Sequence, residues 1–266
     1  MIHTTTDSST SGLFRLLDTA GLLDRLGETA LVLIKPNLVE ARLPPITTPV
    51  DLVEGVVVYL QRRRPQCRIV VGEGTGSVRY ATEHCFAQLG YRRMAERRGI
   101  TLLDLNTAPL QRLVDRKLVR LPEIYLPEIL AEAFLLSVPV LKAHSMAGVT
   151  LTMKNMLGCV PPAHYRIGNS WGKSAFHADL DQAIYALNSY RHADFSLLDA
   201  TVGMAEAHLW GPTCQPAPGI LAAGSDPVAL DSYGAGLLGR DWTGIGHIRL
   251  AHGHLGQAEP LAVVAV

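Results

Sequence analysis

The residues with the clearest chemical potential lie just beyond a short apolar run, Phe134–Val138, which predicts a buried strand ended by Pro139. Lys142 and His144 follow two residues apart. In an extended segment, side chains at that spacing point to the same side. An ammonium and an imidazole on one face predict a site that binds an anion or stabilises a carbanion.

A second polar pair, Lys154 and Asn155, lies in an otherwise apolar stretch between Gly148 and Gly158. Any one of these basic residues alone is better explained as a side chain that reaches water from the end of an element. Three basic groups and an amide in so short a window together favour an anion site.

Two earlier apolar runs also end in polar residues. Leu31–Ile34 leads into Lys35 and Asn37, and Arg68–Val71 leads into the glycine-rich segment Gly72–Ser77. Both runs predict buried parallel strands, and ligands gather at the carboxyl ends of such strands. We therefore expect Lys35 and Asn37 to contact substrate, although a strand-end lysine and an Asx turn explain them equally well.

The glycine-rich segment after the second run could bring backbone amides close to a phosphate or carboxylate, so we expect Gly74, Thr75 and Gly76 to bind substrate. The spacing matches neither a dinucleotide loop nor a P-loop. Glu73 is an acid where an anion would otherwise sit. It predicts a metal ligand, a general base or a partner for Lys35 or Lys142, and a tight turn with an exposed glutamate is the alternative.

A polar segment rich in glycine and proline, residues 159–176, predicts a lid-like insertion, because long irregular connections in compact domains are usually functional. Its aromatic residues, among them Trp171, favour an ordered lid. We expect Tyr165 and Arg166 to contact substrate from it. His177 follows directly and is a second candidate for acid or base catalysis.

Two acids near the end of the chain could support the basic residues. Asp226 precedes Pro227 and is best explained as a helix cap. Asp231 lies in the first turns of an otherwise apolar helix, where an acid could turn into a cleft. With Glu73, these two would orient the basic groups or hold a divalent cation.

Apolar runs and amphipathic helical segments alternate along the chain, which predicts the α/β class. We expect a mostly parallel, doubly wound sheet with helices on both faces and a long lid-like insertion. The 266 residues suit one domain, with residues 1–12 as a frayed end.

Composition excludes several function classes. The 24 basic and 24 acidic residues leave no net charge, which argues against nucleic acid as a partner. No apolar run approaches the ~20 residues that span a bilayer, and the N-terminal sequence does not resemble a secretion signal, so we expect a cytoplasmic protein. The four cysteines lack zinc or iron–sulfur spacing. The sequence leaves a homo-oligomer open.

Several blocks together resemble the domain-of-unknown-function 362 family, over about residues 31–256. The blocks are Leu33–Leu38, Val71–Gly74, Val138–His144, Gly148–Gly158, His177 and Ala222–Asp231. The resemblance implies family membership but no activity. Many relatives look to be joined to ferredoxin-like cysteine modules, a pattern from which this chain departs. The order of Lys154 and His177 also distantly resembles the amino-terminal region of nickel-pincer lactate racemases, which implies that both residues face one cleft.

We expect an enzyme that transfers protons on a small anionic carbonyl or carboxylate compound, as an isomerase, racemase, lyase or cyclase does. Lys35, Lys142 and Lys154 would bind the anion or stabilise an enolate, and His144 and His177 would act as acid and base. One alternative is a redox accessory protein with a bound flavin or a partner's iron–sulfur cluster. The other is a non-catalytic anion or metabolite carrier.

Overall fold

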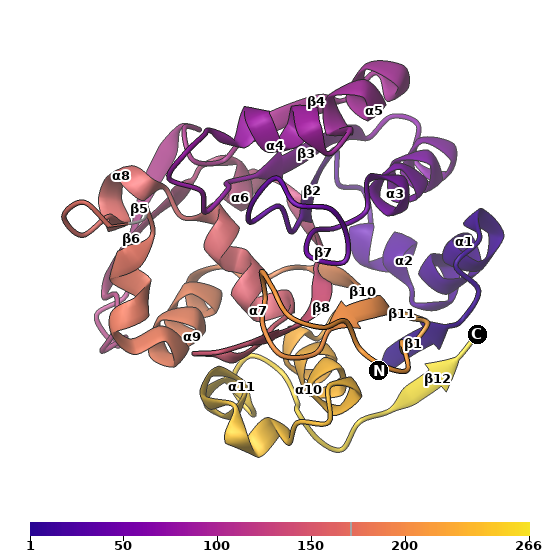
Figure 1. The fold of residues 1–266 in the computed structure, drawn as a ribbon. Helices are drawn as coiled ribbons and strands as arrows, with labels where there is room; N and C mark the ends of the chain where they lie inside the picture. Colours follow the sequence, from indigo (N-terminus) through magenta and orange to yellow (C-terminus); the bar gives the residue numbers. More distant parts are fainter. Residues whose placement is uncertain (171) are drawn as a thin grey trace.

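The computed structural model describes residues 1–170 and 172–266. Among these residues, ten strands form the main sheet, whose longest path runs β12-β1-β11-β10-β7-β2-β3-β4 (Figure 1). The strands of this sheet are β1 (Ile2–Thr5), β2 (Leu31–Pro36), β3 (Arg68–Glu73), β4 (Thr101–Asp104), β7 (Phe134–Val138), β8 (Val140–His144), β9 (Gly148–Thr150), β10 (Phe195–Met204), β11 (Ile220–Gly224) and β12 (Val263–Ala265).

The centre of the sheet is parallel, as the sequence predicts. Strands β4, β3, β2, β7 and β10 pair in parallel, and β8 continues the parallel pairing with β10. Antiparallel pairs join β11 to β10 and to β1, and β9 to β8. The expectation of a mostly parallel α/β sheet is therefore confirmed.

Alternating side chains give the sheet two apolar faces. Within β2, Val32 and Ile34 join one core cluster, and Leu33 joins the other. The first cluster is covered by α1 (Thr10–Thr19), α2 (Leu22–Leu26), α3 (Val50–Arg63), α4 (Thr82–Gln88) and α5 (Tyr91–Arg98). Because strands buried on both faces cannot alternate with polar residues, the central runs read as continuously apolar.

The opposite face carries the later helices, so the sheet is doubly wound (Figure 1). These are α6 (Ile129–Glu132), α7 (Thr152–Asn155), α8 (Pro162–Tyr165), α9 (Leu180–Tyr190), α10 (Pro227–Leu237) and α11 (Gly246–Ala251). Short 3₁₀ turns lie at Met156–Cys159, Ser174–Asp179 and Trp242–Gly244. No helix within the described residues is both long and apolar enough to cross a bilayer.

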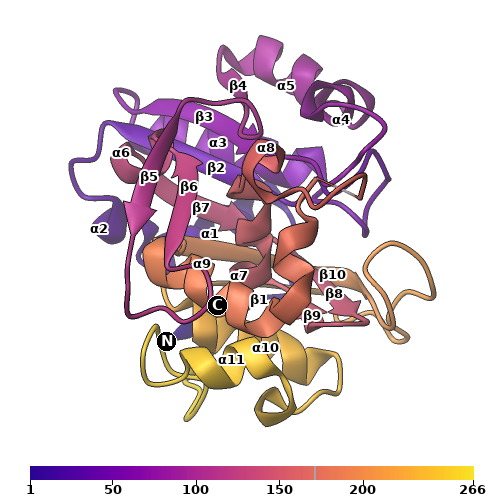
Figure 2. The same ribbon diagram turned by 90° about the vertical axis from the view of Figure 1, so that its left-hand side faces the viewer.

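A two-stranded hairpin, β5 (Leu110–Val114) and β6 (Glu123–Pro127), stands apart from the main sheet beside α9 (Figure 2). The Tyr190 hydroxyl of α9 donates to the Leu121 carbonyl and accepts from the Asp115 amide. The sequence predicts a hairpin over residues 110–126, most clearly over residues 114–121. In the structure the strands are Leu110–Val114 and Glu123–Pro127, so most of residues 114–121 form the loop that connects them.

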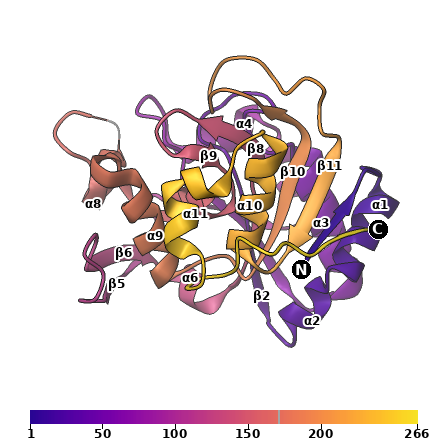
Figure 3. The ribbon, with the colours of Figure 1, turned by 90° about the horizontal axis from the view of Figure 1, so that it is seen from below.

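The expectation of a frayed N-terminus, residues 1–12, is wrong. Strand β1 pairs with β11 on one side and β12 on the other, which brings the two chain ends together (Figure 3). Ile2 is buried, and Ser9 caps α1 by accepting from the Gly12 amide at 3.2 Å. The threonine-rich composition suggests a loop, yet threonine is a good strand former once its side chain is buried.

Candidate functional site

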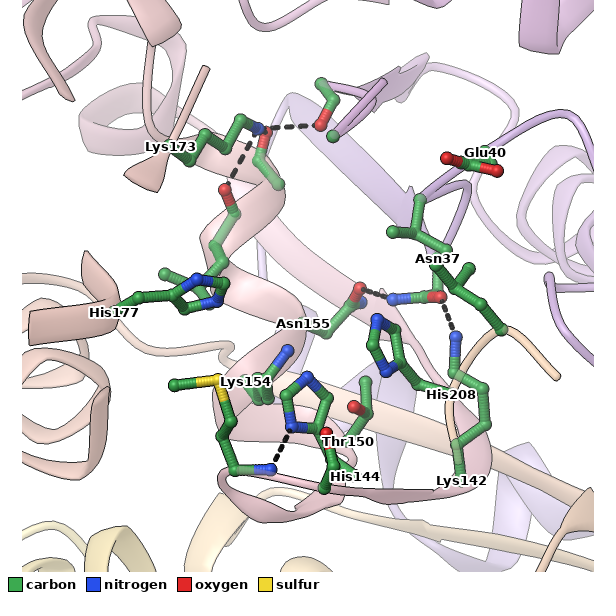
Figure 4. A pocket seen from close by; sticks show the side chains of 18 of the residues that line it. Asn37, Glu40, Lys142, His144, Thr150, Lys154, Asn155, Lys173, His177 and His208 are labelled. Atoms are coloured by element: carbon green, nitrogen blue, oxygen red, sulfur yellow. Dashed lines mark hydrogen bonds between the residues drawn. The ribbon is translucent and has the colours of Figure 1, made fainter. Parts of the chain in front are cut away.

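A cavity of about 360 Å³ lies at the carboxyl ends of the central strands (Figure 4). Segments that follow β2, β3, β8 and β10 all contribute to it, as expected for a parallel sheet. Its polar lining consists of Asn37, Glu40, Glu73, Lys142, His144, Ser145, Thr150, Lys154, Asn155, Lys173, His177 and His208.

Lys154 supplies an ammonium that faces this cavity. Lys154 lies on α7, and the buried Asp231 holds the first amides of this helix. The two carboxylate oxygens of Asp231 accept from Thr152 N at 2.7 Å and Met153 N at 3.0 Å. Burial raises the pKa of Asp231 to about 7. Asp231 therefore positions the helix that carries Lys154 and does not itself line the cavity.

The Lys154 ammonium forms no hydrogen bond or ion pair with any residue in the described ranges 1–170 and 172–266. Figure 4 places it among the rings of His144, His177 and His208. Desolvation by burial lowers the pKa of Lys154 to about 8. Near neutral pH the cavity therefore contains an uncompensated cation, which is the feature expected of an anion site.

His144 is held as a neutral imidazole. Its Nδ1 accepts hydrogen bonds from the backbone amides of Met146 and Ala147, both at 3.1 Å, so the ring proton is on Nε2. Burial, with the nearby Lys154 as a further cause, lowers the pKa of His144 to about 2. The ring therefore offers a donor toward the cavity.

His208 stacks on His144, with ring centroids 4.2 Å apart and an interplanar angle of 26°. Burial and then Lys154 lower its pKa to about 3, so this ring is also neutral. The sequence does not point to His208, because the apolar run Phe195–Leu198 predicts a strand that ends at Asp199. Since β10 continues to Met204, the residues that follow it reach the same sheet edge as those after β2 and β3.

His177 lines the same cavity as Lys154, as the sequence predicts. Burial and the charge of Lys154 lower the pKa of His177. Thr150 also lines the cavity, is 4% exposed, and its hydroxyl finds no hydrogen-bond partner among the residues described. A substrate oxygen would satisfy it.

Lys142 is buried in a hydrogen-bonded network at the cavity wall. Its ammonium donates to Asn37 Oδ1 and to the Ile46 carbonyl, both at 2.7 Å. Asn37 Nδ2 donates to Asn155 Oδ1 at 2.9 Å. Burial holds the pKa of Lys142 well below its usual value. Lys142 thus orients the two amides that line the cavity, while its own ammonium is largely committed to protein oxygens.

Lys35 is fully buried and does not line the cavity, contrary to the expected substrate contact. Its ammonium donates to Glu73 Oε1 at 2.7 Å and to Asn155 Oδ1 at 3.2 Å. The suggested pairing of Glu73 with Lys35 is confirmed. A side chain at Gly158 would overlap both charged groups, so this glycine is required by close packing.

A family model described as "Domain of unknown function (DUF362)" matches residues 32–236 of the chain. The chain belongs to this family. The matched range contains every residue that lines the cavity. A search of curated proteins finds no match to the chain. The DUF362 match therefore supports the resemblance seen in the sequence and leaves the activity to be argued from the site.

The glycine-rich turn of this DUF362 chain is not an amide cradle, contrary to expectation. Gly74 N donates to Glu73 Oε1, Thr75 N to Thr82 Oγ1 and Gly76 N to the Val39 carbonyl. Gly74 and Gly76 line the cavity, and Thr75 does not. Because α4 starts only at Thr82, the turn folds onto its own neighbours and satisfies its amides internally.

Lys173 holds the insertion at residues 159–176 against the site. It is not among the site residues expected from the sequence. Its buried ammonium donates to the carbonyls of Gly74, Leu157 and Gly158 at 2.7, 3.0 and 3.3 Å. Burial lowers the pKa of Lys173 to about 8.

Two predicted contacts from the same insertion lie away from the cavity. The buried Tyr165 hydroxyl accepts from Tyr125 N at 2.7 Å. Arg166 is exposed and donates to the Ser170 carbonyl at 2.8 Å. Trp171 lies outside the described residues.

The three acids proposed as metal ligands do not form one site. Glu73 pairs with Lys35, and Asp231 holds the first turn of α7. Asp226 caps α10 by accepting from Val228 N and Ala229 N, both at 2.9 Å. In the part of the chain that the structure describes, no group of three or more His, Cys, Asp or Glu side chains could hold a metal ion.

Proposed function

We propose that this DUF362 protein is a proton-transfer enzyme, of the isomerase, racemase, lyase or cyclase type, for a small anionic carbonyl or carboxylate compound. The observation that carries the proposal is the Lys154 ammonium, which has no hydrogen-bond or ion-pair partner among residues 1–170 and 172–266 and faces a cavity between imidazoles that burial keeps neutral. Catalytic groups work best when their pKa values lie near the operating pH, and Lys154 meets that condition.

In this mechanism Lys154 has two roles. As an ammonium it attracts the substrate anion into the cavity. After it has released its proton to solvent, for which its pKa of about 8 is suited, the neutral amine removes a proton from the carbon next to the substrate carbonyl. The proton then resides on Lys154 and returns to the same carbon or to another position. His177 faces the same space and is the candidate for the second proton transfer.

The role proposed for His144 differs from the acid or base expected from sequence. Because its Nδ1 accepts two backbone hydrogen bonds, its Nε2–H is the group available to substrate. A neutral imidazole donor can stabilise the oxygen of an enolate as negative charge develops on it. His208, stacked beside it, and the Thr150 hydroxyl would complete the oxygen-binding side.

Hydrogen exchange tests this proposal without knowledge of the natural product. The protein is incubated in D₂O with 2-oxo and 2-hydroxy monocarboxylic acids, and NMR follows loss of the C3 hydrogens of the 2-oxo acids and of the C2 hydrogen of the 2-hydroxy acids, each against a protein-free sample. We expect exchange with the wild-type protein and none with Lys154→Met. Lys117→Met, which changes an exposed lysine, is the matched control and should exchange normally.

His144→Asn separates chemistry from folding in the same assay. Asn can still accept from the Met146 and Ala147 amides, so the thermal midpoint should stay near the wild-type value. Loss of the donor toward the cavity should slow exchange by about 10²–10³-fold. Acids that bind through Lys154 but never exchange would overturn the enzyme proposal in favour of an anion carrier.

A further inference from the structure

The mouth of the cavity is apolar, unlike its floor. Three large side chains line the cavity and remain exposed to solvent: Val78 at 61%, Met146 at 56% and Trp210 at 62%. They come from three separate connections, those after β3, β8 and β10. Exposed apolar side chains are common singly, but their convergence on one opening marks a binding surface.

The charges in the cavity are arranged for one anionic group. Three lysines line the cavity, but Lys142 and Lys173 donate to protein oxygens, so Lys154 is the one among the described residues whose ammonium is left to meet an anion. The exposed apolar residues lie around the opening. Glu40 also lines the cavity, and its carboxylate pairs with the exposed Arg42 at 3.2 Å. A second carboxylate on the substrate would therefore meet apolar side chains and Glu40 at the mouth instead of a free cation.

The size of the cavity indicates more than a three-carbon acid. A volume of about 360 Å³ falls within the roughly 300–1,000 Å³ that small-molecule sites span. Val39 and Leu209, both partly buried, add to the apolar lining. A ligand that reaches Lys154 with one end thus places its other end against apolar surface.

We propose that the substrate is a monocarboxylate with an apolar tail, aliphatic or aromatic. Its anionic head binds at Lys154, and its tail lies against Val78, Met146 and Trp210. This inference rests on the proposed function, because it takes Lys154 as the group that binds the anion. It goes further in naming the class of acid.

Calorimetric titration tests the tail directly. The ligands are straight-chain 2-oxo monoacids of three to ten carbons, with 2-oxoglutarate as a dianion of five carbons. We expect affinity to rise by about fourfold for each CH₂ buried, until the tail leaves the apolar mouth. 2-Oxoglutarate should bind more weakly than the five-carbon monoacid.

Two variants of exposed residues locate the tail. Trp210→Ala and Val78→Thr should flatten the dependence of affinity on chain length, because each removes apolar surface at the mouth. The matched control is Val119→Thr in the β5–β6 loop, where Val119 is 98% exposed and does not line the cavity. It should reproduce the wild-type series.

The outcomes distinguish this inference from the proposed function. If short acids exchange protons and the affinity for acids does not depend on chain length, the proposed apolar tail is overturned and the enzyme proposal stays intact. Rising affinity without exchange would support the tail and overturn the enzyme proposal. A length-independent affinity together with a dimer that Trp210→Ala dissociates, measured by light scattering, would assign the mouth to a second copy. Failure of every acid to bind would overturn both.

Discussion

At the scale of single residues, the interior lysines differ in what their ammonium groups contact. Lys35 pairs with Glu73, Lys142 donates to an amide and a carbonyl, and Lys173 donates to three carbonyls. Lys154 contacts the cavity instead. Lys154 is only partly exposed, and an ammonium removed from water without a partner among the described residues costs free energy, so its presence here favours a role that an apolar side chain could not perform.

The pKa of Lys154, about 8, predicts how binding depends on pH. Below pH 8 the ammonium is charged and attracts a carboxylate. Above pH 8 the amine loses its charge, and affinity for a monocarboxylate should fall by up to about tenfold per pH unit. Calorimetry between pH 6.5 and 9.5 measures this decline. Lys154→Met should bind weakly at every pH, and a decline that persists in this variant would assign the titration to another group.

The same lowered pKa also affects stability. Because an exposed lysine titrates near 10.5, the unfolded chain binds more protons than the folded chain between about pH 8 and 10.5. The contribution of Lys154 to the free energy of unfolding therefore rises across that range and is unfavourable below it. Lys173, with a similar pKa, adds a contribution of the same sign, so Lys154→Met removes only part of the rise.

At the scale of elements, Lys173 ties the 159–176 segment to the strands beneath it. Its three acceptors belong to the turn after β3 and to the 3₁₀ turn after α7. The segment thus closes against the same two turns that frame the cavity. A side chain at Gly74 would overlap the Asn106 amide oxygen and the Gly158 carbonyl, so these turns are also packed directly on each other.

Lys173→Met should loosen this segment. Three carbonyls would lose their shared donor, and each unsatisfied group costs about 1–3 kcal/mol when it stays buried. We expect faster amide hydrogen exchange within residues 160–176, measured by mass spectrometry, with slow exchange preserved in β2 and β3. Arg166→Gln is the control within the segment, since Arg166 is exposed and contacts only a local carbonyl. Equal protection from amide exchange in both variants would contradict the proposal that Lys173 holds this segment.

At the scale of the whole molecule, the Lys35–Glu73 pair connects neighbouring strands beneath the cavity. Glu73 also accepts from Leu38 N at 2.9 Å, and Lys35 reaches Asn155 on α7. The pair therefore fixes the ends of β2 and β3 against the helix that carries the proposed catalytic lysine. Lys35 does not line the cavity, so the pair supports the site from beneath it.

Lys35→Met should destabilise the protein by about 3–5 kcal/mol, because it leaves Glu73 as an unpaired buried charge. Lys35→Met combined with Glu73→Gln should recover part of that loss. Urea denaturation followed by circular dichroism measures both variants. Arg112→Met breaks an exposed ion pair with Glu123 and should hardly move the transition. A loss of stability in Lys35→Met as small as that in Arg112→Met would contradict the structural role of the Lys35–Glu73 pair.

Much of the fold was predictable because continuous apolar runs identify strands that are buried on both faces, as in Leu31–Ile34 and Phe134–Val138. The positions of Asn37 and His144 at the cavity followed from placing polar residues after such runs, whereas a shared cleft for Lys154 and His177 was only what a distant resemblance implied. The sequence could not reveal that Lys35 turns into the core while Asn37 turns into the cavity. That choice depends on Glu73, a partner 38 residues away.

Two other differences have separate causes. The sequence predicts one helix over residues 81–98, but Gly90, with φ of +84°, divides it into α4 and α5, because this conformation interrupts a helix but suits glycine. His208 escaped notice because the true length of β10 depends on pairing with β8, including the bridge between Met204 and Lys142. Strand ends set by a distant partner leave little trace in the local sequence.

The uneven exposure of the lysines has a practical consequence. The chain has five lysines. Lys35, Lys142 and Lys173 are buried. Lys117 lies on the surface, and Lys154 faces the cavity. Among the lysines, a small acylating reagent thus meets one outer and one inner amine, besides the exposed α-amine of Met1. The extent of acylation at Lys154, located by peptide mapping, reports whether a compound occupies the cavity, so metabolite mixtures can be screened for ligands before any reaction is known.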